Sequence, residues 1–226
     1  MALKLDMSKA YDRVEWCFLE KLMRKMGFHE RWINLTMICV KTVTYSILVN
    51  GEPRGLIHPS RGIRQGDPLP PFLFLLCTEG LNGLIKQAKV NGDIHGFSLC
   101  RRGPKLTHLL FTDDSLLFCR ATVEECGHVL DILKNYEKAS GQKVNGGKTS
   151  LFFSKSIPNE TKSSIKQALG PLFTSGKGKE GKLQLHQRKG MEKTPRLGRK
   201  ATFTSRKGSL DQGSNPGYTN IYYRVF

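Results

Sequence analysis

The sequence predicts an α+β fold in which helices cover an antiparallel sheet. Segments with apolar residues at helical spacing interleave with short apolar or alternating segments over the first 170 residues. Two-residue turn signals join some of the short segments, as expected for antiparallel hairpins. The longest helical segment is apolar on nearly all sides, which predicts that it is buried against the sheet. With 226 residues, the chain is long enough for one domain with a substantial core.

The first half of the chain predicts a strand, two helices and a hairpin. A short apolar run ends at Asp6, as expected for a buried strand that delivers a carboxylate at its end. Gly27 follows a helical pattern and ends it. Asn50 and Gly51 form a strong two-residue turn signal. The expected ranges are 2–5 for the strand, 14–26 and 30–41 for the helices, and 42–49 with 55–58 for the hairpin.

The second half adds a long helix and a second hairpin. A Gly- and Pro-rich loop that begins at residue 61 opens a helix over about 68–90. The stretch 109–118 predicts two short strands joined by a tight turn, with Asp113 and Asp114 at the tip. An amphipathic helix over 122–140 and a strand over 149–154 are expected to follow. We expect residues 1–170 to form the folded domain and residues 171–226 to form a basic tail of low order.

The charge favours a polyanionic partner. Lys and Arg number 36 against 19 Asp and Glu, a formal net charge of +17, which is typical of proteins that bind nucleic acid. The six cysteines have no Cys-x-x-Cys spacing, so neither a zinc site nor a disulfide framework is expected. The chain has no signal-peptide pattern and no apolar run near the ~20 residues that span a bilayer. We expect an intracellular protein, nuclear or cytoplasmic, with no membrane partner.

Three carboxylates are candidates for a catalytic site. If the strand that ends at Asp6 lies beside the hairpin with Asp113 and Asp114, the three acids converge at one edge of a sheet. Converging carboxylates suit Mg²⁺, which binds a few carboxylates together with substrate phosphates. Two ions about 4 Å apart stabilise the attacking and leaving oxygens of a phosphoryl transfer. The alternative is structural, with Asp6 as a strand-end cap and the pair as an ordinary turn.

Four stretches occur in an order that points to one family. They are 3–16 (LKLDMSKAYDRVEW), 61–74 (RGIRQGDPLPPFLF), 111–114 (FTDD) and 141–148 (GQKVNGGK). Together they resemble the successive palm motifs of reverse transcriptases, most closely those of plant LINE-type (non-LTR) retrotransposons. The resemblance covers about residues 3–170 and implies a right-hand polymerase palm.

The resemblance also implies an activity and its substrates. A reverse transcriptase is an RNA-directed DNA polymerase, which adds deoxynucleoside triphosphates to a DNA primer on an RNA template. The resemblance implies two Mg²⁺ ions, or Mn²⁺ in their place. Asp6 and Asp113 would ligate them, and Asp114 would support the second half of the metal site.

Six further positions match motif residues of that family. Tyr11 matches an aromatic residue under the sugar, with packing at a helix start as its alternative role. Lys148 matches a lysine near the phosphates, where it would steady the pyrophosphate or donate a proton, the alternative being a solvated side chain. The other four would approach the nucleotide, the template or backbone phosphate: Arg61, Arg64, Gln65 and Gly66.

The chain also departs from the family pattern. Thr112 stands where Ala is common, and Pro70 stands where Ser is usual. Because the first motif begins at residue 3, and a basic tail replaces the segment that leads into the thumb, we expect the fingers and thumb to be largely missing. Back-translation of residues 186–223 in a shifted frame yields a sequence that resembles the family's own continuation. We therefore interpret residues from about 182 onward as a frameshifted reading.

Two alternatives to an active polymerase remain open. The chain could be a catalytically inactive remnant of a retroelement, since we expect this fragment to lack parts that a working polymerase needs. It could instead be a basic, non-catalytic RNA-binding protein whose acids are structural. RNA binding that depends on salt but not on Mg²⁺ or on Asp6 would favour the second alternative.

Overall fold

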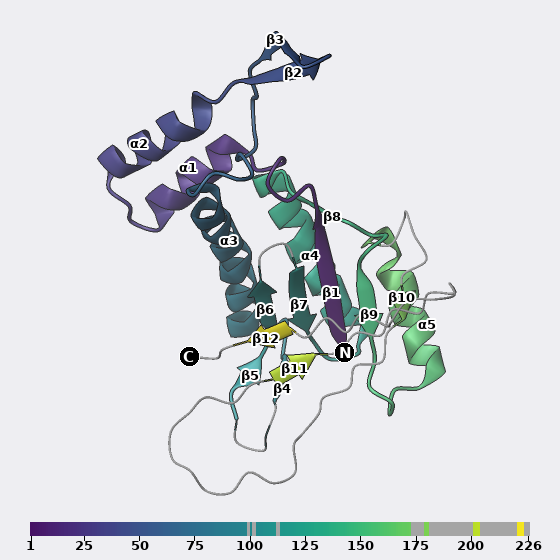
Figure 1. Cartoon of the computed structure of the whole chain (residues 1–226). Coiled ribbons are helices and arrows are strands. Elements are labelled where there is room, and N and C mark those ends of the chain that lie inside the picture. The colour runs from purple at the N-terminus through teal and green to yellow at the C-terminus, as the bar shows by residue number, and fades with distance from the viewer. Residues whose placement is uncertain are drawn as a thin grey trace, which may run out of the picture.

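The computed structural model describes residues 1–98, 100, 103–111, 114–172, 179–180, 201–203 and 221–223. Figure 1 shows a sheet with α3 (Pro70–Asn91) and α4 (Val123–Ser140) on one side, and the hairpin of β2 (Tyr45–Val49) and β3 (Glu52–Ile57) extending away from it. The predicted α+β class with an antiparallel sheet and covering helices is confirmed.

Strand β1 (Ala2–Ser8) lies at the centre of the main sheet. It pairs antiparallel with three strands, and its neighbour β7 pairs in turn with β6 (His108–Phe111). The three partners are β7 (Asp114–Phe118), β8 (Lys143–Val144) and β9 (Ser150–Phe152). The N-terminal strand therefore lies between β7 on one side and β8 and β9 on the other, all of which come much later in the chain.

The two faces of β1 have different surroundings because strand side chains alternate. Leu3 and Leu5 are buried in the main core with residues of the helices. The opposite face begins at Ala2, which packs in a smaller apolar cluster with Leu116 and Phe118 of β7. Further along the same face lie the charged residues of the candidate site, so one end of this face is apolar and the other polar.

The elements before the long helix follow the predicted order. They are α1 (Trp16–Lys25), α2 (Glu30–Lys41) and the β2–β3 hairpin, whose turn is Asn50-Gly51. Asn50 and Gly51 both have positive φ, as that turn requires. Helix α2 has the predicted bounds, whereas the first helix begins two residues later than predicted. Strand β1 is longer than the predicted 2–5 and includes Asp6.

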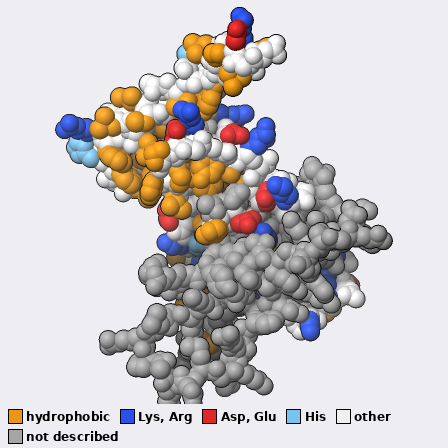
Figure 2. All heavy atoms as spheres, in the orientation of Figure 1, with side chains coloured by type: hydrophobic (Ala, Val, Ile, Leu, Met, Phe, Trp, Pro, Cys, Tyr) orange, Lys and Arg blue, Asp and Glu red, His pale blue; other side chains and the backbone are white. Residues whose placement is uncertain are grey.

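The long helix buries one side in the core that contains Leu3 and Leu5 of β1, as its apolar character predicts, but its first turns also expose apolar side chains. Phe72 is 66% exposed and Leu75 is 53% exposed. Helix α3 packs against α1 and α4, so the side that faces neither helix remains open to solvent at its first turns. Figure 2 shows hydrophobic side chains gathered over this part of the molecule and over α2. The exposed apolar residues of α2 are Trp32, Leu35 and Ile38.

Besides the short strand β8, several described elements were not predicted from the sequence. They are a small hairpin of β4 (Phe97–Ser98) and β5 (Lys105–Leu106), the helix α5 (Asn159–Ala168), and the short 3-10 helix η1 (Gly170–Leu172). None of the described helices is both long enough and apolar enough to cross a bilayer.

The expected low-order tail and frame change fall mostly outside the described residues. Apart from the two residues that belong to η1, the described parts form three short strands, of which β10 pairs parallel with β9. Their bounds are Lys179–Glu180 for β10, Ala201–Phe203 for β11 and Ile221–Tyr223 for β12.

Candidate active site

Asp6 and Asp114 lie directly opposite each other on neighbouring strands. Asp6 belongs to the central strand β1, and Asp114 is the first residue of β7. Residues paired in this way in an antiparallel ladder have Cα atoms about 4.5–5.5 Å apart. The sheet therefore brings together two of the three predicted carboxylates. Asp113, the third, lies outside the described residues, as does Thr112.

A lysine ammonium lies near each of these two carboxylates. The Lys148 Nζ is 3.8 Å from an Asp6 carboxylate oxygen, and the Lys4 Nζ is 3.1 Å from one of Asp114. Lys148 is 70% exposed, whereas the side chains of Lys4 and Asp114 are each about 30% exposed. Lys148 thus lies beside Asp6, and its role near the phosphates stays a prediction. Lys4 was not predicted as a site residue.

The loop that carries Lys148 is held against the strand that carries Asp6. The Asn145 backbone N–H donates to the Asp6 carbonyl at 2.8 Å, and β8 pairs with β1 through Met7 and Val144. The Lys148 N–H donates in turn to the Asn145 carbonyl at 3.1 Å. These backbone bonds give the Lys148 side chain a fixed base beside Asp6.

The donor set suits a hard divalent cation. Carboxylate oxygens are the ligands that Mg²⁺ prefers, and Asp6 and Asp114 present two of them from fixed strand positions. Among the described residues, no group of three or more His, Cys, Asp or Glu is placed to hold a metal ion. The resemblance implies Asp113 as a further ligand, and this residue lies outside the described residues.

The turn after β1 is held by the loop that opens α3. The Gly62 N–H donates to the Val14 carbonyl at 2.8 Å, and the Ile63 N–H donates to the Tyr11 carbonyl at 3.0 Å. The Trp16 indole N–H donates to the Gly62 carbonyl at 2.7 Å. Gly62 has a φ of +88°, and a Cβ there would lie 2.8 Å from the Asp12 carbonyl oxygen. Sequence reasoning missed Gly62, although it lies in a quoted motif.

The end of α4 holds the same turn from another side. The buried Gln142 side chain donates to the Ala10 carbonyl at 2.9 Å and accepts a hydrogen bond from the Tyr136 hydroxyl. That hydroxyl also lies 3.1 Å from the Cys77 carbonyl, and burial raises the pKa of Tyr136. The Glu15 N–H donates to the Ser140 carbonyl at 2.9 Å. Three of the four motifs therefore meet at the turn over residues 9–13.

Tyr11 stands on this turn and stacks on Phe74 of α3. Their ring centroids are 4.7 Å apart, with planes 13° from parallel. The ring is partly buried, and it lies in a turn rather than at the start of a helix. Its packing role is thus visible in the structure, and its contact with a sugar remains a prediction.

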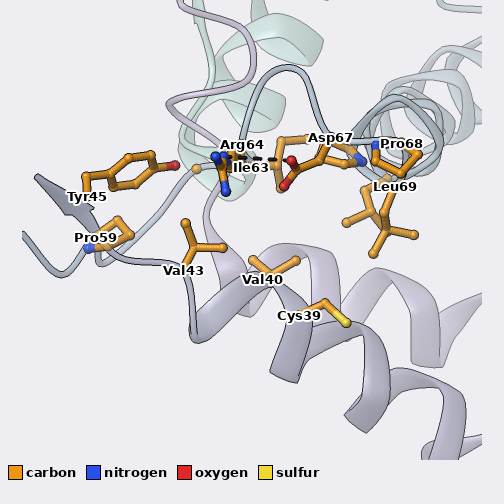
Figure 3. A pocket seen from close by; sticks show the side chains of 13 residues that line it. Cys39, Val40, Val43, Tyr45, Pro59, Ile63, Arg64, Asp67, Pro68 and Leu69 are labelled. Atoms are coloured by element: carbon orange, nitrogen blue, oxygen red, sulfur yellow. Dashed lines mark ion pairs between the residues drawn. The ribbon is translucent and has the colours of Figure 1, made fainter.

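The residues of the predicted nucleotide and template loop lie near a shallow pocket of about 190 Å³. Figure 3 shows this pocket between the end of α2 and the loop before α3, with Arg64 and Asp67 on its rim. The Arg64 guanidinium is 3.7 Å from the Asp67 carboxylate, and that of Arg61 is 3.4 Å from Glu15. A phosphate would have to compete with these acids for either arginine.

Gln65 and Gly66 are exposed at the same loop. Gly66 has a φ of +94°, a conformation that favours glycine, and a Cβ there would meet nothing within 4 Å. The need for glycine at residue 66 therefore comes from its backbone angle. The lining of the pocket includes none of Asp6, Asp114 and Lys148, so it is separate from the paired carboxylates.

The four motifs, the antiparallel sheet with its covering helices, and the opposed carboxylates of Asp6 and Asp114 point to one protein family. A match of the chain to a model of that family agrees. The family model "Reverse transcriptase (RNA-dependent DNA polymerase)" matches residues 1–189. The chain belongs to the reverse transcriptase family. Reverse transcriptases as a family use divalent metal ions and copy a nucleic acid template.

Relatives link this reverse transcriptase to retrotransposons. An uncharacterized mitochondrial protein of Arabidopsis thaliana is 52% identical over 68 residues, which are 30% of this chain and 56% of that protein. The Pol polyprotein of the type-1 retrotransposable element R2 of Popillia japonica is 30% identical over 115 residues, 51% of this chain and 18% of the polyprotein. The predicted resemblance to reverse transcriptases of non-LTR retrotransposons is confirmed. The chain spans little more than half of the first relative and less than a fifth of the second.

Solved structures support the fold. Apo telomerase from Candida tropicalis has a TM-score of 0.50 at 17% identity, covering 66% of this chain and 29% of the telomerase. Telomerase from Candida albicans, in complex with a fragment of telomeric RNA, has a TM-score of 0.51 at 15% identity over 70% of this chain and 27% of its own. At these identities the likeness concerns the fold alone.

Proposed function

We propose that this chain is the palm of a protein that copies RNA into DNA, with its folded unit within residues 1–170. The observation that carries the proposal is the direct opposition of Asp6 and Asp114 in the sheet, with Lys148 beside Asp6. An ordinary turn requires no carboxylate on the neighbouring strand. A site that binds Mg²⁺ together with substrate phosphates uses one or two carboxylates, and the opposition of β1 and β7 supplies two.

Asp6 and Asp114 are the described residues that would hold the metal, and Asp113 would complete the set. Two Mg²⁺ ions, or Mn²⁺, would stabilise the attacking and leaving oxygens of the phosphoryl transfer when bound. The substrates would be a deoxynucleoside triphosphate, a DNA primer and an RNA template. The excess of 17 positive charges favours binding of the two nucleic acid strands.

The chain's own side chains would position the reactants. The exposed ammonium of Lys148 can leave Asp6 for the pyrophosphate, where it would balance negative charge and donate a proton. Tyr11, held by Phe74 and by the 9–13 turn, would support the sugar of the incoming nucleotide. Arg61 and Arg64 would exchange their partner acids for backbone phosphates.

Primer extension on an RNA template, with RNA affinity measured in parallel, tests the proposal. Asp6→Asn should reduce Mg²⁺-dependent extension at least about 100-fold and leave RNA affinity within about twofold, because it removes a metal ligand from the chemical step. Asp131→Asn changes an exposed carboxylate of α4 and serves as the matched control. It should leave both measurements unchanged.

The same experiment separates the two alternatives. Salt-sensitive RNA binding without extension, unaffected by Mg²⁺ and by Asp6→Asn, would identify a basic RNA-binding protein, which the net charge of +17 also favours. Metal binding that depends on Asp6, without extension by the wild-type chain at any Mg²⁺ or Mn²⁺ concentration, would identify an inactive remnant.

A further inference from the structure

Lys4 is placed to act on the carboxylate site from within the sheet. It lies two residues before Asp6 on β1, so the two side chains leave the same face of the strand. Asp114 is opposite Asp6, which makes Lys4 and Asp114 diagonal neighbours on that face. The 3.1 Å distance from the Lys4 Nζ to the Asp114 carboxylate shows that this diagonal contact is made.

The local surroundings make a cation at residue 4 unexpected on packing grounds. Lys4 is opposite Leu116, and the adjoining part of the same face is the apolar cluster that contains Ala2, Leu116 and Phe118. An apolar side chain at residue 4 would extend that cluster. A lysine instead supplies positive charge where two carboxylates are directly opposed, an arrangement that is otherwise destabilising.

The backbone of Lys4 is fixed on both sides. Its strand pairs with β7 through Leu116 and with β9 through Ser150. Lys148, by comparison, projects from a turn, is 70% exposed, and lies 3.8 Å from Asp6. The ion pair between Lys4 and Asp114 is therefore shorter than the one between Lys148 and Asp6, and its lysine is less exposed to solvent. Because the backbone of Lys4 is fixed, only its side chain has to move to free the Asp114 carboxylate.

We propose that Lys4 is a built-in counter-ion of Asp114 that competes with divalent metal for this carboxylate. In the metal-free chain the ammonium offsets the repulsion between Asp6 and Asp114. When a metal ion binds, the side chain must release Asp114, so the lysine lowers metal affinity. This inference rests on the proposed function, because it requires that metal binds at these carboxylates.

Mn²⁺ binding to the full chain, followed by the electron paramagnetic resonance signal of the free ion, tests the inference. Lys4→Met should bind Mn²⁺ about fivefold more tightly than the wild type, since a partly exposed ion pair no longer opposes binding. Lys4→Arg, which keeps the charge, should bind as the wild type does. Lys41→Met is the matched control, because it removes a 3.5 Å Lys–Glu ion pair with Glu20 in another part of the chain.

Thermal unfolding supplies a second readout. In EDTA, Lys4→Met should melt at a lower temperature than the wild type, and saturating Mn²⁺ should close that gap, because the ion replaces the lost ammonium. Lys41→Met should show the same shift with and without Mn²⁺. Lys4→Gln, which keeps a polar side chain, should show the same tighter Mn²⁺ binding if the Met variant does not fold.

The outcomes separate this inference from the proposed function. One outcome is that Asp6→Asn weakens Mn²⁺ binding, while Lys4→Met and Lys4→Gln bind Mn²⁺ as the wild type does or more weakly. That outcome would contradict the proposed competition between Lys4 and metal, and it would leave the metal site itself supported. If neither the wild type nor the Lys4 variants bind Mn²⁺, both are wrong.

Discussion

The Gln142 side-chain amide donates a 2.9 Å hydrogen bond to the Ala10 carbonyl, 132 residues earlier in the chain. Gln142 is buried, and its own carbonyl accepts from Tyr136 of α4. One amide therefore links the helix behind the sheet to the turn that carries Tyr11. The strand with Asp6 leads directly into that turn, so the same amide supports the geometry of the candidate site.

Gln142→Ala should lower the free energy of unfolding by about 1–3 kcal/mol, because it leaves the Ala10 carbonyl without its buried donor. The Tyr136 hydroxyl would keep the Cys77 carbonyl as its partner. Urea unfolding measures the change. Gln167→Ala, at an exposed position of α5, should change stability by less than about 0.5 kcal/mol. Equal effects of the two substitutions would contradict a structural role for the Gln142 amide.

Gly62→Ala should destabilise the chain by at least about 2 kcal/mol, since residue 62 has a positive φ and the new Cβ would meet the Asp12 backbone. Gly127→Ala is the control. Gly127 lies within α4, where a Cβ has open space, and alanine there should stabilise the helix by up to about 1 kcal/mol. Thermal or urea unfolding distinguishes them, and a stable Gly62→Ala variant would show that this loop tolerates rearrangement.

Asp6→Asn should raise the stability of the metal-free chain by about 0.5 kcal/mol, because it removes a like charge directly opposite Asp114. Unfolding in EDTA measures this change, and Asp131→Asn should show none. A loss of stability in Asp6→Asn would mean that the attraction between Asp6 and Lys148 outweighs the repulsion between the acids. Asp6→Asn is thus expected to lose primer extension and yet to be more stable than the wild type when no metal is bound.

Stability should fall as the pH rises above about 8.5, and Cys77 should account for part of the slope. Burial raises the pKa of the Cys77 thiol to about 12, whereas an unfolded chain releases this proton near 8.5. Between these values only the unfolded chain loses the proton, so the free energy of unfolding falls by up to about 1.4 kcal/mol per pH unit.

Unfolding at several pH values between 8.5 and 10 tests this prediction. Cys77→Ala should be less stable than the wild type at pH 7, because it leaves a cavity, but its stability should decline less steeply with pH. Cys17→Ala, at an exposed position, should keep the wild-type slope. A wild-type slope in Cys77→Ala would assign the pH dependence to other groups.

The local sequence pattern was sufficient to predict those helices and turns that depend on residues only a few positions apart. The periodic apolar residues of α1 and the Asn50-Gly51 turn led to the observed elements. The apolar composition of α3 predicted its burial against the sheet, but it did not show that Phe72 and Leu75 would be exposed where neither α1 nor α4 covers them. Apolar content alone does not show how many neighbours a helix has.

The sequence by itself determined the family, because the residues of its four motifs occur in order, and it singled out Asp6 and Asp114 as candidate site residues. Only the tertiary structure decided that these two are opposed in one ladder, that Lys4 contacts Asp114, and that Gly62 and Gln142 hold the turn after β1. The physical reason is that each of these contacts joins residues between 46 and 132 positions apart, or depends on a strand register that local sequence does not specify.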